Sequence, residues 1–196
     1  MLLKKTETKP LVRIFSYLPS PRIWKPVITS RLLDINIEIL GTRPEEISNW
    51  LWDYKARKLS SKDIKKYSDY KILGKKGFST KIHKTPEFLK AHPFGVVPAA
   101  FAKNGKVGIF ESNSIMRLIA RLKKKHLLYG ANVYERSRID SFLDASLVFA
   151  TFSQRYLLSI MNNNINSSIK IDANDSFVSY FSGLETSLKL NKNKYI

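Results

Sequence analysis

The sequence contains no cysteine. Nucleophilic, redox and metal-binding chemistry that depends on a thiolate is therefore excluded. No stretch approaches the roughly 20 apolar residues of a membrane-spanning helix, and the lysine-rich residues 1–10 hold no apolar segment long enough for a secretory signal. Because proteins without cysteine fit a reducing compartment, we expect a cytoplasmic location.

Histidine is also scarce, with three residues in the whole chain. His83, His92 and His126 do not have the spacing of metal ligands, and no cluster of Asp and Glu accompanies them. A glycine-rich phosphate loop and a Ser-His-Asp arrangement are missing as well. The sequence therefore predicts no metal site.

Positive charge is abundant by contrast, since 34 Lys and Arg face 16 Asp and Glu, giving a net charge of +18. A field of this sign favours anionic partners such as nucleic acid, acidic proteins or small anions. A general bias of the composition toward lysine explains the same numbers, and both interpretations stay open. The 43% of apolar residues indicates a folded chain with a real core.

The most informative stretch runs from Thr85 to Arg121. Within it, Val96-Val97 leads into Pro98, which lacks the N–H that a central strand needs, so we expect a special geometry there, such as a cis bond. The Val97 backbone would then be free to pair with an extended ligand. Glu111 and Ser112 open a helix, where a carboxylate can hold a ligand ammonium and a hydroxyl with the helix N-terminus can hold a ligand carboxylate.

The segments Thr85-Pro86-Glu87-Phe88-Leu89, His92-Pro93-Phe94-Gly95-Val96-Val97-Pro98 and Ile109-Phe110-Glu111-Ser112-Asn113-Ser114-Ile115 resemble the glutathione-binding half of the glutathione S-transferase superfamily. The family pattern is Asn-Pro-x-Gly-x-Val-Pro followed by Glu-Ser-x-x-Ile, and His92 stands here in place of the Asn. These segments are also similar to the transferase-like domain of the elongation factor 1B gamma subunit. The resemblance implies an α/β thioredoxin-like domain followed by an all-α domain, glutathione as co-substrate, and a homodimer.

The order of predicted elements agrees with that fold. A strand at Leu11–Tyr17, a helix at Pro21–Leu33 with Ser20 as N-cap, and a strand at Ile35–Leu40 predict a parallel pair with a crossover helix. Strands at Val96–Ala102 and Val107–Phe110 then form a hairpin, and a helix follows at Ser112–Arg121. We place the thioredoxin-like domain at residues 10–122.

Residues 44–84 form an enlarged, basic insertion in this domain. We expect an amphipathic helix at Glu45–Tyr54. Lysine and arginine then alternate with aromatic residues, a pattern that suits RNA or an acidic protein partner, but also a solvated insertion whose aromatics pack on the domain. The cations are Lys55, Arg57, Lys58, Lys62, Lys65, Lys66, Lys71, Lys75, Lys76, Lys81 and Lys84, and the aromatics are Tyr54, Tyr67, Tyr70 and Phe78.

After a linker at Lys123–His126, the remaining residues 130–196 predict an all-helical domain that is short for the family. One helix runs from Asn132 to Met161, Asn162–Asn164 break it, and another helix covers Ala173–Leu190. Two helices bury little apolar area by themselves. Dimerisation is therefore expected on energetic grounds as well as by resemblance.

The candidate site follows from these motifs and from the resemblance. Val97, Pro98, Glu111 and Ser112 would bind glutathione. Stabilising its thiolate needs one hydrogen-bond donor, and Ser20 at a helix N-terminus is the first candidate, with Tyr17 and Ser16 as alternatives. Two functions remain open: a glutathione transferase-like enzyme, or a non-catalytic interaction module that docks protein or RNA partners.

Overall fold

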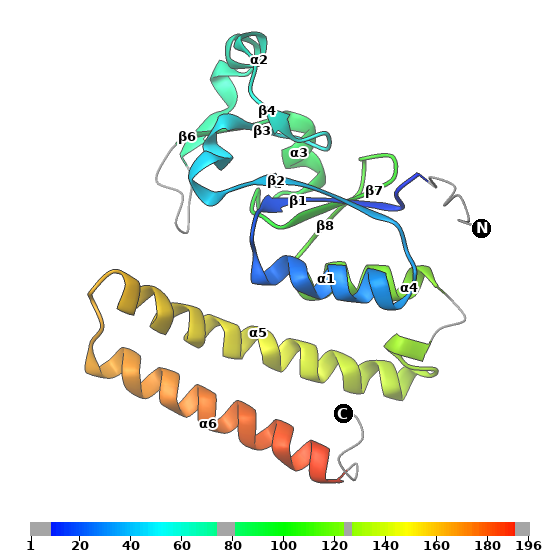
Figure 1. Ribbon diagram of the computed structural model, residues 1–196, viewed down its shortest axis with the longest axis vertical. Coiled ribbons are helices and arrows are strands. Elements are labelled where there is room, and N and C mark those ends of the chain that lie inside the picture. Colours follow the sequence, from blue (N-terminus) through cyan, green and yellow to red (C-terminus); the bar gives the residue numbers. More distant parts are fainter. Residues whose placement is uncertain (1–8, 74–80, 124–126, 191–196) are drawn as a thin grey trace, which may run out of the picture. The chain divides into compact units, whose positions relative to one another are not determined.

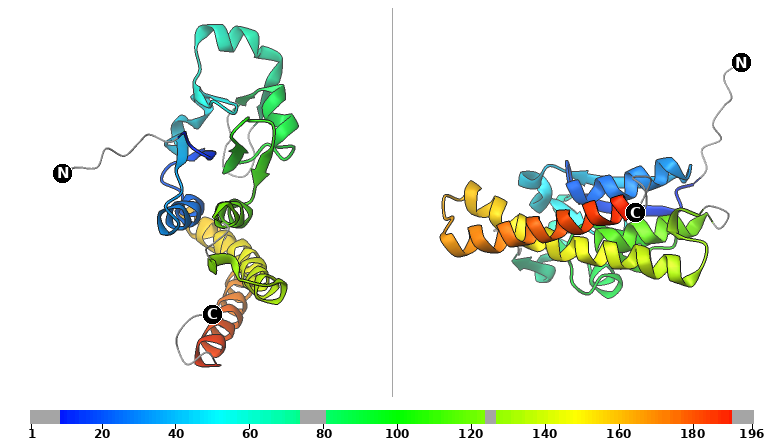
Figure 2. Two further views of the ribbon diagram at one scale, coloured as in Figure 1. Left: turned by 90° about the vertical axis from the view of Figure 1, so that its right-hand side faces the viewer. Right: turned by 90° about the horizontal axis from the view of Figure 1, so that it is seen from below.

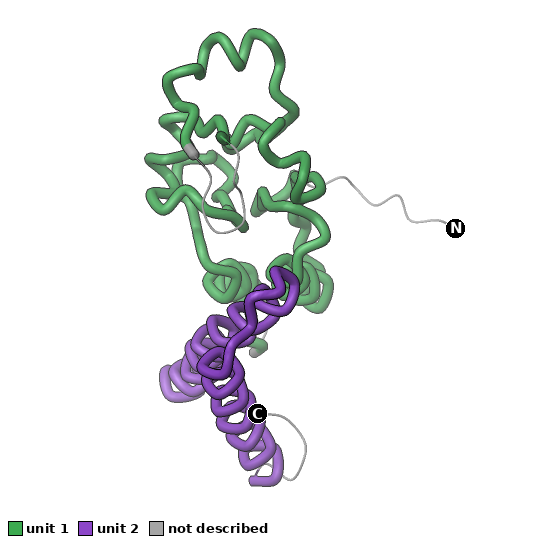
Figure 3. The backbone as a smooth tube through the Cα atoms, turned by 90° about the vertical axis from the view of Figure 1, so that its left-hand side faces the viewer, with its two compact units in different colours: residues 1–129 green, residues 130–196 purple. Residues whose placement is uncertain are grey.

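The computed structural model describes residues 9–73, 81–123 and 127–190. It divides into two compact units, residues 1–129 and 130–196 (Figure 3). Residues 75, 76 and 78 of the predicted basic run and 124–126 of the predicted linker lie outside the described residues.

The first unit is built on a mixed sheet of the predicted α/β type. Strand β1 (Val12–Tyr17) pairs in parallel with β2 (Ile37–Thr42) and antiparallel with β7 (Ala99–Ala102), which pairs antiparallel with β8 (Gly108–Phe110). The strand order is β2-β1-β7-β8. Helices α1 (Pro21–Leu32) and α4 (Ser112–Leu122) lie side by side on one face of this sheet (Figures 1 and 2).

One apolar cluster joins this sheet to the two helices, because alternate strand residues point to the helix face. It consists of Val12, Ile14, Ile23, Ala100, Ile115 and Ile119. The strands and helices predicted for this sheet and its two helices are present within two or three residues of their expected bounds. Strand β7 begins later than expected, at Ala99, because the preceding Pro98 has no N–H for the ladder.

The predicted insertion forms a second small sheet instead of a loop-rich excursion. Its strands are β3 (Trp50–Trp52), β4 (Arg57–Lys58), β5 (Lys71–Leu73) and β6 (Lys81–Lys84), in the order β4-β3-β6-β5. The short helix η1 (Pro44–Asn49) precedes β3, and α3 (Pro86–Ala91) follows β6. Helices α2 (Ser61–Lys66) and η2 (Ser68–Tyr70) lie between β4 and β5.

The prediction of a helix at Glu45–Tyr54 is wrong. Residues 44–49 form the 3-10 helix η1, and Trp50–Trp52 continue as a strand parallel to β6. Bulky aromatic residues are good strand formers, and the pairing with β6 buries both Leu51 and Trp52. The tertiary contact therefore overrides the helical spacing of the apolar residues.

The insertion also supplies a large part of the core. Trp52 is 2% exposed and meets Phe15 edge-on at 5.4 Å and Phe88 at 5.9 Å between ring centroids. Its indole N–H donates to the Ile47 carbonyl at 3.2 Å. Lys84, which the sequence placed on the basic surface, is buried with its Nζ 5.1 Å from the centre of the Trp52 ring. Lys84 is thus not part of the exposed basic surface, whose cations lie on residues 55–81.

The second unit is a hairpin of two long helices, α5 (Val133–Met161) and α6 (Ser167–Leu190). Helix α6 begins before the expected Ala173 because the Asn166 side chain accepts a hydrogen bond from the Ile169 N–H at 3.0 Å and starts the helix earlier. The two helices join through an aromatic cluster of Phe149, Phe177, Tyr180 and Phe181. In the parts of the chain that the structure describes, no helix is long and apolar enough to span a bilayer.

Leu127–Tyr129 (η3), a short 3-10 helix, closes the first unit before α5. The Arg121 guanidinium lies 4.7 Å from the centre of the Tyr129 ring and donates a hydrogen bond to its hydroxyl at 3.0 Å. These contacts attach η3 to the end of α4.

Candidate functional site

The strand register gathers the predicted glutathione-binding residues at one end of the first sheet. Ala99 of β7 lies opposite Phe110 of β8. Val97 and Pro98 directly precede β7, and Glu111 and Ser112 directly follow β8. The two motifs, separated by the hairpin in the sequence, therefore lie at the same end of the sheet.

The end of β1 lies at the same end of the sheet as the start of β7. Phe15 pairs with Ala99 at the start of β7, and Tyr17 packs against the apolar cluster that contains Val97. Tyr17 is also the last residue of β1, directly before the turn that leads to Ser20 and α1. The candidate thiol-activating residues thus lie at the same end of the sheet as the candidate peptide-binding residues.

Val97 offers its backbone and not its side chain. The Val97–Pro98 peptide bond is cis, as the sequence predicts. The Val97 side chain is buried in the cluster around Trp52. Within the described part of the chain, no hydrogen bond to the Val97 N–H or C=O is present. Those two groups are therefore available to an extended ligand, which would bind here as an added strand.

A carboxylate and a hydroxyl stand at the start of α4. Glu111 is exposed and adopts φ 65°, in the left-handed region that non-glycine residues rarely occupy. Such strain persists where the surroundings fix it, and it clusters at ligand sites. Ser112, the first residue of α4, is buried beside it. A carboxylate and a helix N-terminus thus stand next to each other.

Lys25 of α1 reaches this point from the neighbouring helix. Its Nζ donates to Asn113 Oδ1 at 2.6 Å, which holds the first turns of α1 and α4 together. Burial lowers the pKa of Lys25, and the charge of Arg22 lowers it further, whereas Glu111 acts in the opposite direction. From the sequence, Arg22 and Lys25 could meet a ligand carboxylate, but a solvated helix face was the preferred interpretation. The position of Lys25 one turn after the Ser20 N-cap was the only available signal that it adjoins the site.

Ser20 is the N-cap residue of α1, as predicted, but its hydroxyl does not cap the helix. The other serine and threonine caps behave differently, because Ser60 accepts from the Asp63 N–H and Thr85 accepts from the Phe88 N–H. Ser20 is 2% exposed, and its Oγ has no hydrogen-bond partner among the described residues. A buried hydroxyl without a partner is costly, so a purely structural capping role does not account for it.

The alternatives to Ser20 lie just before it in the chain. Ser16 is fully buried, and its Oγ likewise has no partner in the described parts of the structure. Tyr17 is half-buried at the end of β1. Three hydroxyls therefore stand within five residues of one another, and the geometry leaves all of them as candidates, with Ser20 nearest the helix N-terminus that attracts an anion.

His92, which stands where the family pattern has Asn, is part of the core beneath the site. Its ring stacks on Phe88 at 5.7 Å and lies 5.2 Å from the Phe110 ring. Burial lowers its pKa, so the ring is neutral near pH 7. Its carbonyl accepts a hydrogen bond from Gly95 N–H at 2.9 Å, and Gly95 needs φ 56° for this turn. His92 therefore supports the turn that presents Val97.

Among residues 9–73, 81–123 and 127–190, no group of three or more His, Asp or Glu side chains could hold a metal ion.

The curated relatives match this chain over less than half of its length. No family model matches the chain. Elongation factor 1-gamma 1 of Oryza sativa is 40% identical over 81 residues, which is 41% of this chain and 19% of that protein. Glutathione S-transferase 1 of Zea mays is 39% identical over 77 residues, 39% of this chain and 35% of that protein. The match thus spans between a fifth and about a third of these relatives.

Solved structures extend the likeness over nearly the whole chain. Ure2p in complex with glutathione superposes with a TM-score of 0.63 at 18% identity, covering 94% of this chain and 72% of that one. Poplar glutathione transferase F1 superposes with a TM-score of 0.58 at 18% identity, covering 93% and 71%. At this identity the likeness concerns the fold. The chain resembles the glutathione S-transferase superfamily in sequence and has its fold.

Proposed function

We propose that this chain, with its glutathione S-transferase fold, binds glutathione at the end of the β1-β7-β8 sheet and promotes attack of the glutathione thiolate on an electrophile. The observation that supports the proposal is the pairing of β7 with β8. Ala99, which follows Pro98, lies opposite Phe110, which precedes Glu111, so both motifs lie at the same end of the sheet. Glutathione acts here as a co-substrate, and no metal is involved. A cytoplasmic homodimer, as the resemblance implies, is part of the proposal.

The groups at the site match those of glutathione one by one. The peptide backbone of the ligand pairs with Val97 next to Pro98. The ligand ammonium pairs with the exposed Glu111 carboxylate, and the neighbouring ligand carboxylate binds Ser112 and the N-terminus of α4. Lys25 and Arg22 add positive charge beside α4, which favours a ligand of net negative charge.

The thiol of the ligand is then placed toward the N-terminus of α1. Hydrogen bonding to a thiolate favours the charged form and lowers the thiol pKa. Ser20 has a hydroxyl with no partner among the described residues to make that bond, and Tyr17 and Ser16 remain the alternatives. The thiolate attacks the electrophile, a carbon–sulfur bond forms, and the leaving group departs with the electron pair of the bond that breaks.

Calorimetric titration of the purified chain with glutathione tests the binding step. We expect saturable binding, weakened about tenfold by Ser112→Ala, which removes one hydrogen bond to a charged ligand group. Glu111→Gln should weaken it similarly by removing the charge that holds the ammonium. Ser114→Ala, one position beyond Asn113 on the same helix, is the matched control and should bind as the unchanged chain does.

A folded chain that shows no heat of binding at millimolar glutathione would contradict the proposal. Equal binding by Ser112→Ala and the unchanged chain would place the ligand elsewhere.

A second candidate function is a non-catalytic module that binds RNA through the exposed cations of the insertion. The observation that favours it is a surface of exposed cations on residues 55–81, next to a Tyr67–Tyr70 ring pair at 6.4 Å. Asp63 is buried and paired with Arg57, so these two charges offset each other. The exposed cations are Lys55, Arg57, Lys58, Lys62, Lys65, Lys66, Lys71 and Lys81.

Salt dependence of binding to a labelled single-stranded RNA tests this candidate. Replacing Lys62, Lys65 and Lys66 by Gln should weaken binding and reduce the slope of log K against log salt by about 2, because each lost phosphate contact contributes about 0.7. The matched control is a triple replacement of exposed lysines elsewhere in this unit, Lys90, Lys103 and Lys106. Binding that ignores salt would contradict RNA recognition, and capture of an acidic protein without RNA would assign the surface to a protein partner.

A further inference from the structure

Helix α1 carries apolar side chains on the face turned away from the sheet as well as on the face packed against it. On the inner side, Ile23 is buried in the cluster that joins the sheet to the helices. On the outer side, Trp24, Ile28 and Leu32 are between 53% and 63% exposed. A helix that is apolar all round is normally buried all round. The outer face of α1 is therefore unusual for a surface that stays in contact with water.

The three exposed side chains form one straight stripe. Trp24, Ile28 and Leu32 stand at positions i, i+4 and i+8 of α1, so they follow a single ridge of the helix surface about 12 Å long. Single apolar residues are normal on a protein surface, whereas an aligned group marks an interaction site. A ridge one side chain wide has the shape that fits into the groove of another helix.

Helix α4 packs on the same face of the sheet and differs from α1 on its outer side. It buries Ile115 and Ile119 against the sheet. Its half-buried and exposed positions include Arg117 and Arg121, and the exposed Leu122 is its final residue. The two helices have the same place in the fold, so packing on the sheet does not account for the apolar outer stripe of α1.

The surface around the stripe is positively charged. The sequences of α1 and α4 contain no Asp or Glu, and the nearest acids, Asp34 and Glu111, stand just outside the two helices. Arg121 donates to the Tyr129 hydroxyl, which is an uncharged partner, so this contact leaves its charge in place. The cations of the two helices are Arg22, Lys25, Arg31, Arg117 and Arg121. An apolar stripe is thus set in a positive field.

We infer that α1 binds an amphipathic helix of a partner protein, whose apolar face packs on Trp24, Ile28 and Leu32 and whose flanking positions carry Asp or Glu. Recognition of a helix in this way uses apolar anchors three and four residues apart. Tryptophan is among the residues that contribute most to such interfaces. The cations of α1 and α4 meet the carboxylates at the rim, where complementary charge selects the partner. This binding is additional to both proposed functions.

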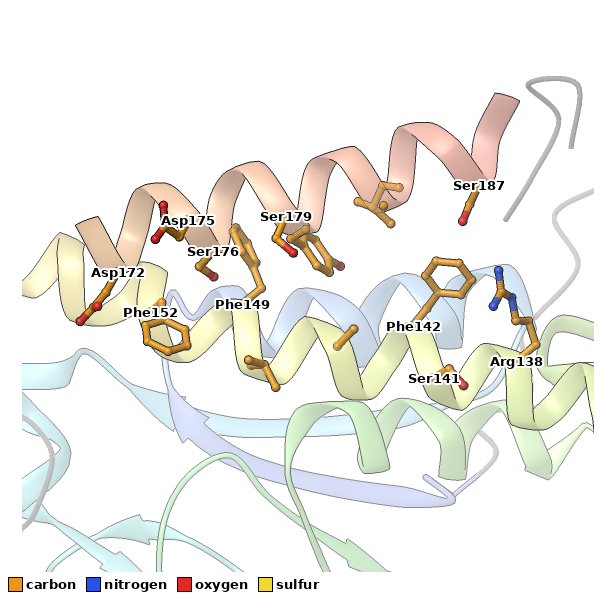
Figure 4. A pocket seen from close by; sticks show the side chains of 15 residues that line it. Arg138, Ser141, Phe142, Phe149, Phe152, Asp172, Asp175, Ser176, Ser179 and Ser187 are labelled. Carbon is orange, nitrogen blue, oxygen red and sulfur yellow. The ribbon is translucent and has the colours of Figure 1, made fainter. Parts of the chain in front are cut away.

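The second unit has an open groove of about 700 Å³ between α5 and α6 that suits this partner less well. Phe142 and Phe149 lie along its α5 wall, but the α6 wall carries Asp172, Asp175 and Ser176 (Figure 4). The carboxylates on that wall would repel the acidic flanks of the partner helix. The charge pattern therefore assigns the partner to α1.

Binding of two synthetic peptide helices to the full chain tests this inference. The first peptide has Leu along one face and Glu at the positions beside it, and the second has Lys in place of every Glu. We expect the Glu peptide to bind, as measured by the fluorescence anisotropy of a label on the peptide, and to bind less tightly as salt rises. The Lys peptide should bind at least about tenfold more weakly, because like charges face each other. Equal binding of the two peptides, or no binding of either, would overturn the inference.

Variants of the stripe test whether α1 is the surface that binds. Ile28→Gln and Leu32→Gln should each weaken binding of the Glu peptide about tenfold, because each removes an apolar anchor. Arg31→Glu should weaken it through charge and reduce its dependence on salt. Val107→Gln changes an apolar residue of the same unit that is similarly exposed, and this matched control should bind as the unchanged chain does. Stripe variants that bind the peptide normally would contradict the assignment to α1.

Three other results would give the stripe a different occupant and overturn the inference. A lower urea midpoint of the full chain with Ile28→Gln would mean that another part of the chain covers the stripe. Loss of self-association in sedimentation velocity with the same variant would assign it to a second copy. Binding of phosphatidylserine vesicles that Ile28→Gln abolishes, without binding of the peptide, would assign it to a membrane surface. None of these results would bear on glutathione binding, which calorimetry measures separately.

Discussion

Trp52→Ala should lower the free energy of unfolding by about 3–5 kcal/mol, the cost typical of removing a large aromatic side chain from a core. The reason is the position of the ring. It is 2% exposed, it makes edge-on contacts with Phe15 and Phe88, and its N–H is bonded to the Ile47 carbonyl. Those partners come from β1, α3 and η1, so the loss would loosen three elements at once.

Urea unfolding followed by circular dichroism measures this loss on the full chain. Tyr70→Ala is the matched control within the same insertion, because Tyr70 is 41% exposed and should change stability by no more than about 0.5 kcal/mol. A small effect of Trp52→Ala would mean that the insertion folds apart from the domain. A large effect would establish that it is an integral part of the core.

This expectation differs from the one that the sequence alone supports. Residues 44–84 look like a basic insertion because lysines dominate the count, yet the few apolar residues decide where the backbone goes. Trp50-Leu51-Trp52 has the spacing of neither a clear strand nor a clear helix. The partner that settles the matter is Ile82-His83-Lys84, some thirty residues later, and no local pattern announces a parallel pairing at that distance.

The first sheet was easier to predict because its signals are local. Ser20 and Pro21 mark a helix start, Pro98 limits β7, and the Asn104-Gly105 turn joins two adjacent strands. The candidate binding residues could be named for the same reason. Their proximity could not be derived from spacing and depended on the family resemblance, because the two motifs come to the same end of the sheet only through the pairing of β7 with β8.

The sequence did not indicate the packing of two residues near the site. Lys25 looks like any lysine on a helix surface until α4 is packed against α1 and Asn113 accepts its hydrogen bond. His92 looks like a neutral exchange in a loop until its ring is found between Phe88 and Phe110. Both depend on neighbours that are distant in the chain.

Ser20→Ala should separate the structural from the chemical role of this hydroxyl. We expect the rate of conjugation of glutathione to a chlorodinitrobenzene to fall about 10²–10³-fold, the usual effect of removing one donor to a developing or stabilised anion. Stability should not fall, because the Ser20 Oγ has no partner among the described residues to lose. Affinity for glutathione should change little, since Val97, Glu111 and Ser112 are untouched.

Tyr17→Phe and Ser16→Ala, assayed alongside, decide among the three hydroxyls. If Tyr17→Phe alone abolished conjugation, the tyrosine would be the thiol-activating group and Ser20 a buried residue without a chemical task. If all three variants conjugated at the rate of the unchanged chain, the proposed role of a hydroxyl would be wrong. If the unchanged chain and every variant bound glutathione without conjugating it, the interaction module would be favoured. The buried Ser20 hydroxyl would then make no contact with the sulfur.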